Sequence, residues 1–117
     1  MAQSILERIE RGEPLPTSVP ILIQGVQLGK GLRIVGVEGE MVAGLGILIR
    51  DFYAEGITFP LGYSNGEGLY MPTSDMIDEG GYEVVSYWEY RYPAPLAKGF
   101  ESILTQALEQ LRASGVE

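Results

Sequence analysis

The sequence predicts an α/β protein with a mixed sheet of about four strands, covered by helices in a two-layer or three-layer sandwich. A hairpin pattern is followed by a strand–helix–strand pattern within residues 19–63, and a helical apolar pattern closes the chain. With 117 residues, of which 45% are hydrophobic and 21% charged, the chain can bury one core. We therefore expect a single α/β domain over residues 1–117, with a leading segment over 1–18 and a core over 19–112.

The first part of the chain predicts a short helix and then a hairpin. Residues 3–11 have a helical apolar side, which ends at the glycine and prolines that follow. Two β-rich runs, 19–28 and 32–37, flank the turn Gly29-Lys30-Gly31. Because so short a connection joins antiparallel strands, the two runs predict a β-hairpin.

A strand–helix–strand unit overlaps the end of this hairpin. After the strand 32–37, residues 40–55 change to a helical period, and residues 57–63 return to a strand pattern. The helical period rests on apolar residues at spacings of four, three and four, namely Met41, Leu45, Leu48 and Phe52. A helix that connects two strands of one sheet in this way predicts a parallel pair.

The last third of the chain predicts a short helix, a long final strand and a C-terminal helix. The short helix is capped by Thr73 or Ser74 and ends at the glycines 80–81. Residues 82–92 are aromatic and β-branched, which is typical of a strand. Residues 96–112 predict the C-terminal helix. Its apolar face consists of Leu96, Phe100, Leu104, Leu108 and Leu111.

The composition excludes several classes of function. The chain has 8 basic and 16 acidic residues, a net charge of −8, and its basic residues are scattered along the sequence. We therefore expect no nucleic-acid partner and no anionic membrane surface. The absence of cysteine excludes disulfides, thiolate metal sites and a cysteine nucleophile. No signal peptide and no membrane span is apparent, so we expect a soluble, cytoplasmic chain.

Candidate functional residues follow the two parallel strands. The segments 35–40 and 64–70 leave the carboxyl ends of these strands, so Glu40 and Tyr70 should face each other. Purely structural explanations of these residues compete with the functional one. Glu40 would stabilise the first turn of a helix by about 0.3–1 kcal/mol. Tyr70 and Tyr82 would be half-buried packing residues.

Three short motifs in order resemble a known family. They are Val-Glu-Gly-Glu-Met at 37–41, Leu-Gly-Tyr-Ser-Asn-Gly at 61–66 with Tyr-Met-Pro-Thr at 70–73, and Glu-Gly-Gly-Tyr-Glu at 79–83. Together, residues 19–112 resemble the C-terminal part of the catalytic domain of the neutral/alkaline, non-lysosomal ceramidases and their bacterial relatives. In that family, zinc activates water for the hydrolysis of an N-acyl amide.

The resemblance implies roles for three residues. Glu40 and Tyr70 correspond to zinc ligands, and Tyr82 corresponds to the tyrosine that stabilises the oxyanion; Glu40 and Tyr82 are thus the candidate catalytic residues. This chain departs from the family pattern at Glu38, where a proline is expected, and at Glu67, where an aromatic residue is common.

The largest departure is that the sequence has no histidine, whereas the family uses two histidine ligands from earlier in its longer domain. The resemblance therefore implies half of a zinc-amidohydrolase site that binds no zinc tightly and is inactive alone. Its partner would be a histidine-bearing N-terminal part or a separate chain. Two alternatives remain: a non-catalytic binding or assembly module that forms homo-oligomers, or a metal-free hydrolase that pairs Glu40 with Glu67 or an aspartate at about 5–10 Å.

Overall fold

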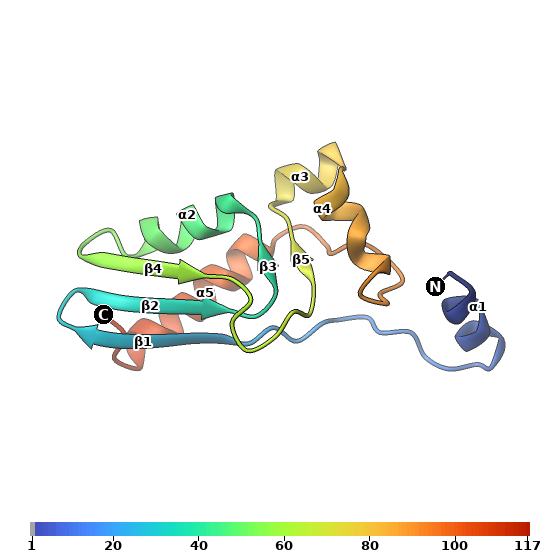
Figure 1. Ribbon diagram of the computed structural model, residues 1–117, viewed down its shortest axis with the longest axis horizontal. Helices are drawn as coiled ribbons and strands as arrows, with labels where there is room; N and C mark the ends of the chain where they lie inside the picture. Colours follow the sequence, from blue (N-terminus) through green and yellow to red (C-terminus); the bar gives the residue numbers. More distant parts are fainter. Residues whose placement is uncertain (1) are drawn as a thin grey trace.

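The computed structural model describes residues 2–117 and confirms the α/β class (Figure 1). Its elements, in chain order, are α1 (Ala2–Glu10), β1 (Ile23–Gly29), β2 (Leu32–Val37), β3 (Glu40–Met41), α2 (Ala43–Phe52), β4 (Ile57–Leu61), β5 (Tyr70–Met71), α3 (Ser74–Glu79), α4 (Tyr82–Val85), the 3-10 helix η1 (Ser86–Trp88) and α5 (Phe100–Ala113).

The main sheet has the strand order β1-β2-β4. Strands β1 and β2 pair antiparallel, which confirms the hairpin. Strands β2 and β4 pair in parallel on either side of α2 in the sequence, which confirms the strand–helix–strand unit. The register places Val26, Ile34 and Phe59 in one row across the three strands.

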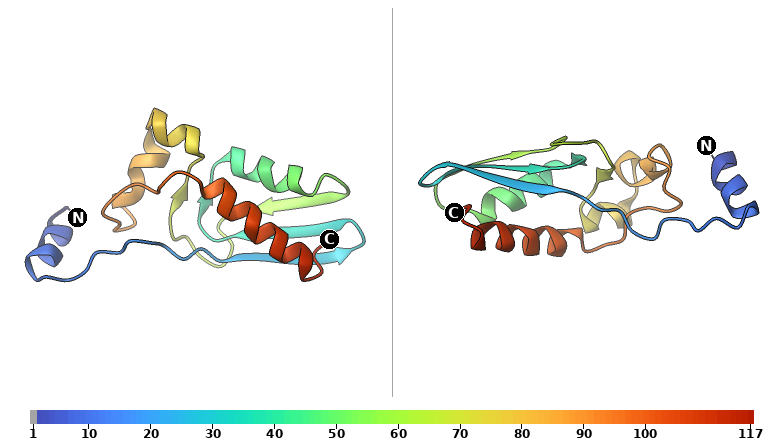
Figure 2. Two further views of the ribbon diagram at one scale, coloured as in Figure 1. Left: turned by 180° about the vertical axis from the view of Figure 1, so that it is seen from behind. Right: turned by 90° about the horizontal axis from the view of Figure 1, so that it is seen from below.

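Helices α2 and α5 lie against the same face of this sheet (Figures 1 and 2). The core between them combines side chains of β2, α2 and α5 with Met71 of β5, which is also fully buried. Its innermost side chains are Val35 and Val37 of β2, Leu45 and Ile49 of α2, and Leu104 and Leu108 of α5. The other face of the sheet carries no helix in the described chain, so the architecture is the two-layer form of the predicted sandwich.

The prediction of a long final strand over residues 82–92 is wrong. This stretch forms α4 and η1, and the amides of Val84 and Val85 both donate to the carbonyl of Gly81. Aromatic and β-branched residues favour a strand only where a neighbouring strand offers a pleated, half-buried surface. The outer edge of β4 contains Pro60, which cannot donate a ladder hydrogen bond, so local helical hydrogen bonds satisfy this backbone instead.

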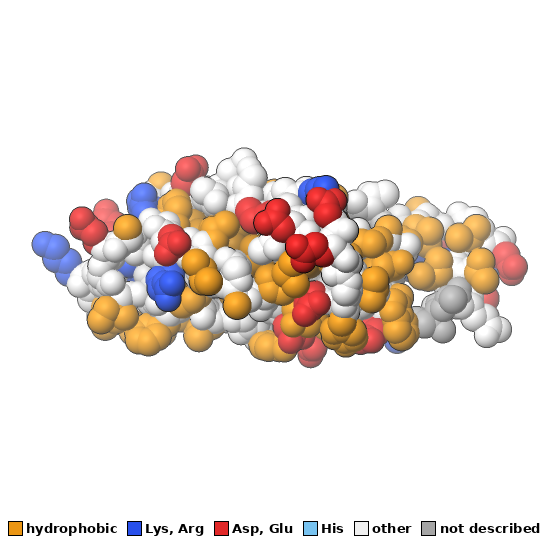
Figure 3. Space-filling view, turned by 90° about the horizontal axis from the view of Figure 1, so that it is seen from above, with side chains coloured by type: hydrophobic (Ala, Val, Ile, Leu, Met, Phe, Trp, Pro, Cys, Tyr) orange, Lys and Arg blue, Asp and Glu red, His pale blue; other side chains and the backbone are white. Residues whose placement is uncertain are grey.

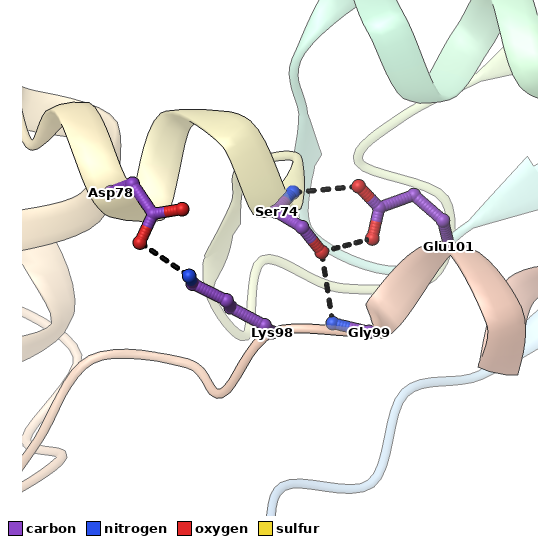
Figure 4. A network of polar contacts seen from close by, with 5 residues as sticks. All are labelled: Ser74, Asp78, Lys98, Gly99 and Glu101. Carbon is purple, nitrogen blue, oxygen red and sulfur yellow. Dashed lines mark hydrogen bonds and ion pairs between the residues drawn. The ribbon is translucent and has the colours of Figure 1, made fainter.

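The N-terminus of α3 is capped by a side chain from another helix (Figure 4). Thr73 occupies the N-cap position, but its side chain makes no capping hydrogen bond. The Glu101 carboxylate of α5 instead accepts from the Ser74 amide at 2.6 Å and from the Ser74 hydroxyl at 2.7 Å. The Ser74 hydroxyl in turn accepts from the Gly99 amide at 2.9 Å, and Lys98 pairs with Asp78. These contacts join α3 to the start of α5.

Replacing Glu101 by glutamine is expected to destabilise the protein by about 1–2 kcal/mol at neutral pH, because a charged acceptor of two hydrogen bonds becomes neutral. Burial alone would raise the pKa of the Glu101 carboxyl, but hydrogen bonds from Ser74 and from its own amide outweigh burial and lower it. A carboxyl whose pKa is lowered in the folded state stabilises the fold at pH values above its usual pKa. This stabilisation is lost as the pH falls through the lowered pKa. Urea denaturation should therefore separate the variant from wild type at neutral pH and bring them together in acid. Glu109→Gln, on the exposed side of α5, is the control and should show no such gap.

The molecule is elongated because α1 stands apart from the sheet. It measures 54 × 27 × 19 Å, and its radius of gyration of 16.1 Å exceeds the ~13 Å typical of a compact chain of this length. Helix α1, predicted over 3–11, lies at one end of the molecule, joined by an extended segment (Figures 1 and 2). None of the helices within residues 2–117 combines the length and apolar character that crossing a bilayer requires.

Candidate functional site

The site is built on a second, two-stranded sheet that the sequence pattern did not predict. Strands β3 and β5 pair in parallel, with Glu40 opposite Tyr70 and Met41 opposite Met71. The Glu40 amide donates to the Leu69 carbonyl at 2.9 Å, and the Val42 amide donates to the Met71 carbonyl at 3.2 Å. Glu40 and Tyr70, distant in the sequence, are therefore neighbours in register.

Gly39 permits this close pairing. Its φ of +94° lies in the region that favours glycine, and a Cβ atom there would stand 2.7 Å from the Leu69 carbonyl oxygen. The Gly39 carbonyl also accepts from the Tyr63 amide at 2.7 Å. This contact holds the chain beyond β4 against β3 and brings Tyr63 to the site.

Glu40 does not serve as an acidic residue of a helical first turn. Helix α2 begins at Ala43, its N-cap is Val42, and its first turn contains no acidic residue. The predicted helix 40–55 therefore starts later than expected, because the pairing of β3 with β5 holds Glu40 in an extended backbone. The explanation of Glu40 through the helix dipole is wrong.

The Glu40 carboxylate interacts with two tyrosines. A hydrogen bond with Glu40, followed by partial desolvation, raises the pKa of Tyr63 to about 12. Burial raises the pKa of Tyr70, and the charges of Glu40 and Glu83 raise it further. Both phenols are therefore neutral at physiological pH, and both lie close enough to Glu40 to be affected by its charge. Sequence reasoning missed Tyr63, although its place just after the carboxyl end of a parallel strand was the available signal.

Tyr82 lies beside Tyr70 but points its hydroxyl elsewhere. The two rings meet edge to face, with centroids 6.1 Å apart and an interplanar angle of 86°. The Tyr82 hydroxyl donates to Glu89 at 3.1 Å, and this hydrogen bond is the main reason why the pKa of Tyr82 is raised. The structure thus brings the three predicted site residues together, with the Tyr82 hydroxyl engaged by Glu89.

The surroundings of the site are acidic. Burial raises the pKa of Tyr90, and the negative charges of Glu67 and Glu40 raise it further. Glu67 also adds to the effect of Glu40 on the pKa of Tyr63, and the charge of Glu89 adds to its hydrogen bond in raising the pKa of Tyr82. Figure 3 shows acidic side chains gathered over the middle of the molecule, among hydrophobic ones. Such a surface favours a cation or a basic group of a partner.

The donors of the described chain do not complete a zinc site. Within residues 2–117, no three His, Cys, Asp or Glu side chains are grouped so that they could hold a metal ion. Around Glu40 the structure supplies one carboxylate and tyrosine hydroxyls, whereas a catalytic zinc uses three protein ligands. Asp78 of α3 is paired with Lys98. Of the donors around Glu40 and including it, Glu40 and Tyr70 are the two to which the resemblance assigns zinc.

An apolar cavity of about 640 Å³ adjoins β5. Leu69, the residue before Tyr70, forms part of its wall, together with the segment 92–98 and Phe100 at the start of α5. The cavity is also lined by residues of the extended segment before β1, from Pro16 to Ile21, and by Ile23 at the start of β1. A cavity with this lining suits an apolar chain rather than a polar ligand.

No protein-family model matches this chain, and no curated protein and no solved structure is detectably similar to it. The fold and the site define a two-layer α/β protein with a carboxylate and tyrosines clustered on a small parallel sheet. The resemblance to ceramidases therefore stays a prediction from the sequence motifs.

Proposed function

We propose that this chain contributes Glu40 and Tyr70 to a composite zinc-amidohydrolase site. Histidine ligands would come from a separate chain or from a further part of the polypeptide, because this sequence has none. The observation that carries the proposal is the in-register pairing of Glu40 with Tyr70. This pairing places the two donor side chains next to each other on neighbouring strands. When bound, zinc supplies an activated water for attack on the amide carbonyl of an N-acyl, ceramide-like substrate.

The chain's own residues have separate parts in this proposal. Glu40 would supply the charged oxygen, and Tyr70, its neighbour in register, would supply a phenol. Tyr82 can donate to an oxyanion only after its hydroxyl leaves Glu89. The cavity next to Leu69 would accept the acyl chain. By itself the chain is expected to be inactive as an amidase, since two donors do not hold a catalytic zinc.

The proposal is tested by replacing the missing histidines with imidazole in solution. Co²⁺, a spectroscopic substitute for zinc, is added to the chain with and without imidazole. We expect the visible absorption of low-coordinate Co²⁺, together with an ultraviolet tyrosinate band, only when protein, metal and imidazole are all present. The tyrosinate is expected because a bound cation reverses the effect of Glu40 and lowers the pKa of Tyr70.

Variants make this test specific. Glu40→Gln and Tyr70→Phe should each abolish both absorption signals, whereas Glu55→Gln, an exposed carboxylate in the turn before β4, should retain them. Absence of the signals in the wild-type chain, or their persistence in Glu40→Gln and Tyr70→Phe, would overturn the proposal.

A further inference from the structure

Within residues 2–117, one face of the main sheet carries no helix and is largely apolar; the loop after β4 covers one end of it, where Ser64 lies against Gly36 and Asn65 donates to Gln24. Side chains alternate across the strands, so that Val35 and Val37 point into the core while their neighbours point outward. We call the outward side of β1, β2 and β4, with the residue just before β1, the open sheet face. Its largest exposed side chains, each 47–58% exposed, are Leu22, Val26, Leu28, Ile57, Phe59 and Leu61.

The outward positions of the three strands carry no charged residue. They are filled by Gln24, Val26, Leu28, Leu32, Ile34, Gly36, Ile57, Phe59 and Leu61. The one charged residue of these strands, Arg33, is buried on the inner side, where its guanidinium lies over the Tyr53 ring. Figure 3, which views the molecule from above, shows hydrophobic side chains along the lower left edge of the molecule. Glu38, the residue after β2, lies at one end of this face, where its carboxylate accepts from the Leu22 amide. Along the strands themselves two copies bring no like charges into contact, so the apolar rows are complementary to themselves.

The size of the open sheet face suits a dimer. Six large apolar side chains that are about half exposed present on the order of 600 Å² of apolar surface, against about 800 Å² that each partner buries in a standard interface. That is the upper end of the apolar patches found on monomers, about 300–600 Å². Extension of the sheet at the outer edge of β4 is a poorer alternative, because Pro60 removes a ladder donor there.

We propose that the open sheet face is the interface of a homodimer, in which two copies of this chain pack sheet against sheet about a two-fold axis. Sheets pack face to face at about 10 Å, so that the row of Val26, Ile34 and Phe59 in one copy lies over the same row of its partner. The net charge of −8 on each copy opposes the dimer at long range. Salt should therefore strengthen the association, because it screens the repulsion and leaves the apolar contact.

The oligomeric state of the purified chain tests this proposal. Sedimentation equilibrium and light scattering should give twice the chain mass of 12.8 kDa at micromolar concentrations, with tighter association at high salt. Phe59→Lys, in the middle of the row, should raise the dimer dissociation constant at least about 100-fold, because each interface buries two unpaired charges. Val26→Lys should act in the same way. Both side chains are about half exposed in the monomer, so the variants should fold, as circular dichroism will show.

Ile103→Lys is the matched control, since Ile103 is 61% exposed on α5, away from the open sheet face, and this variant should remain dimeric. A wild-type chain that stays monomeric up to millimolar concentration would overturn the proposal. So would a dimer that Leu6→Lys in α1 disrupts and Phe59→Lys does not. Glu40→Gln should stay dimeric, so that failure of the zinc proposal and failure of the dimer are distinguishable.

Discussion

Replacing Leu104 by alanine is expected to destabilise the protein by about 3–5 kcal/mol, a large part of the stability of a domain of this size. Leu104 is completely buried on α5, in the core formed with β2 and α2. The substitution removes apolar contacts and leaves a cavity that rigid neighbours fill only in part. The folded population should fall steeply at physiological temperature.

Urea denaturation followed by circular dichroism measures this effect. The preceding residue of α5 is the matched control, because Ile103 is largely exposed and Ile103→Ala should change the free energy of unfolding by less than about 0.5 kcal/mol. Equal destabilisation by the two substitutions would mean that α5 does not pack on the sheet as described.

Replacing Gly39 by alanine is expected to destabilise the protein by about 2–4 kcal/mol and to disrupt the candidate site. The new Cβ would lie 2.7 Å from the Leu69 carbonyl oxygen and 3.3 Å from the Met71 methyl group, at a φ that alanine adopts only under strain. That carbonyl accepts the Glu40 amide, so β3 and β5 must separate.

The separation should be visible in the ionisation of tyrosine. Contact with Glu40 holds the pKa of Tyr63 at about 12, so loss of the contact in Gly39→Ala should lower it toward the usual 10. A tyrosine whose pKa is raised in the folded state stabilises the fold at pH values below its usual pKa. This stabilisation is lost as the pH rises through the raised pKa. Spectrophotometric titration measures the shift, and denaturation in urea measures the stability.

Gly68→Ala is the control for Gly39→Ala. Gly68 lies in the loop just before β5, has no positive φ, and has no atom within 4 Å of the position that a Cβ would take. Alanine there should be neutral or stabilising by up to about 1 kcal/mol, because it restricts the unfolded chain. If both variants were equally stable, the close approach of Gly39 to Leu69 would be disproved.

The candidate site and the open sheet face meet at the end of β4. Leu61 ends β4 on the open sheet face, and two residues later Tyr63 contacts Glu40. A molecule that packs on the strands would therefore reach the edge of the site. Zinc binding in the presence of imidazole should accordingly be measured on both the dimer and Phe59→Lys.

Local patterns were enough to predict most of the main sheet and its helices. The hairpin, the parallel pairing of β2 with β4 and the helices α1, α2, α3 and α5 follow from hydrophobic period and from the glycines and prolines that interrupt it. These signals act between near neighbours in the chain. The topology rule for parallel strands, whose carboxyl ends lie at one edge of the sheet, also indicated that Glu40 and Tyr70 would lie close together.

Other features depended on contacts between distant segments, which no local period records. Residues 82–92 have strand composition, yet they form helices and do not pair with the outer edge of β4, where Pro60 lacks a donor. The cap of α3 comes from Glu101 on another helix, and the two-residue strands β3 and β5 are too short for a sequence period to reveal. Tyr63 joins Glu40 only because the Gly39 backbone holds the loop against β3. Long-range backbone pairing therefore decided which side chains share the site, since it satisfies polar groups that the local sequence leaves free.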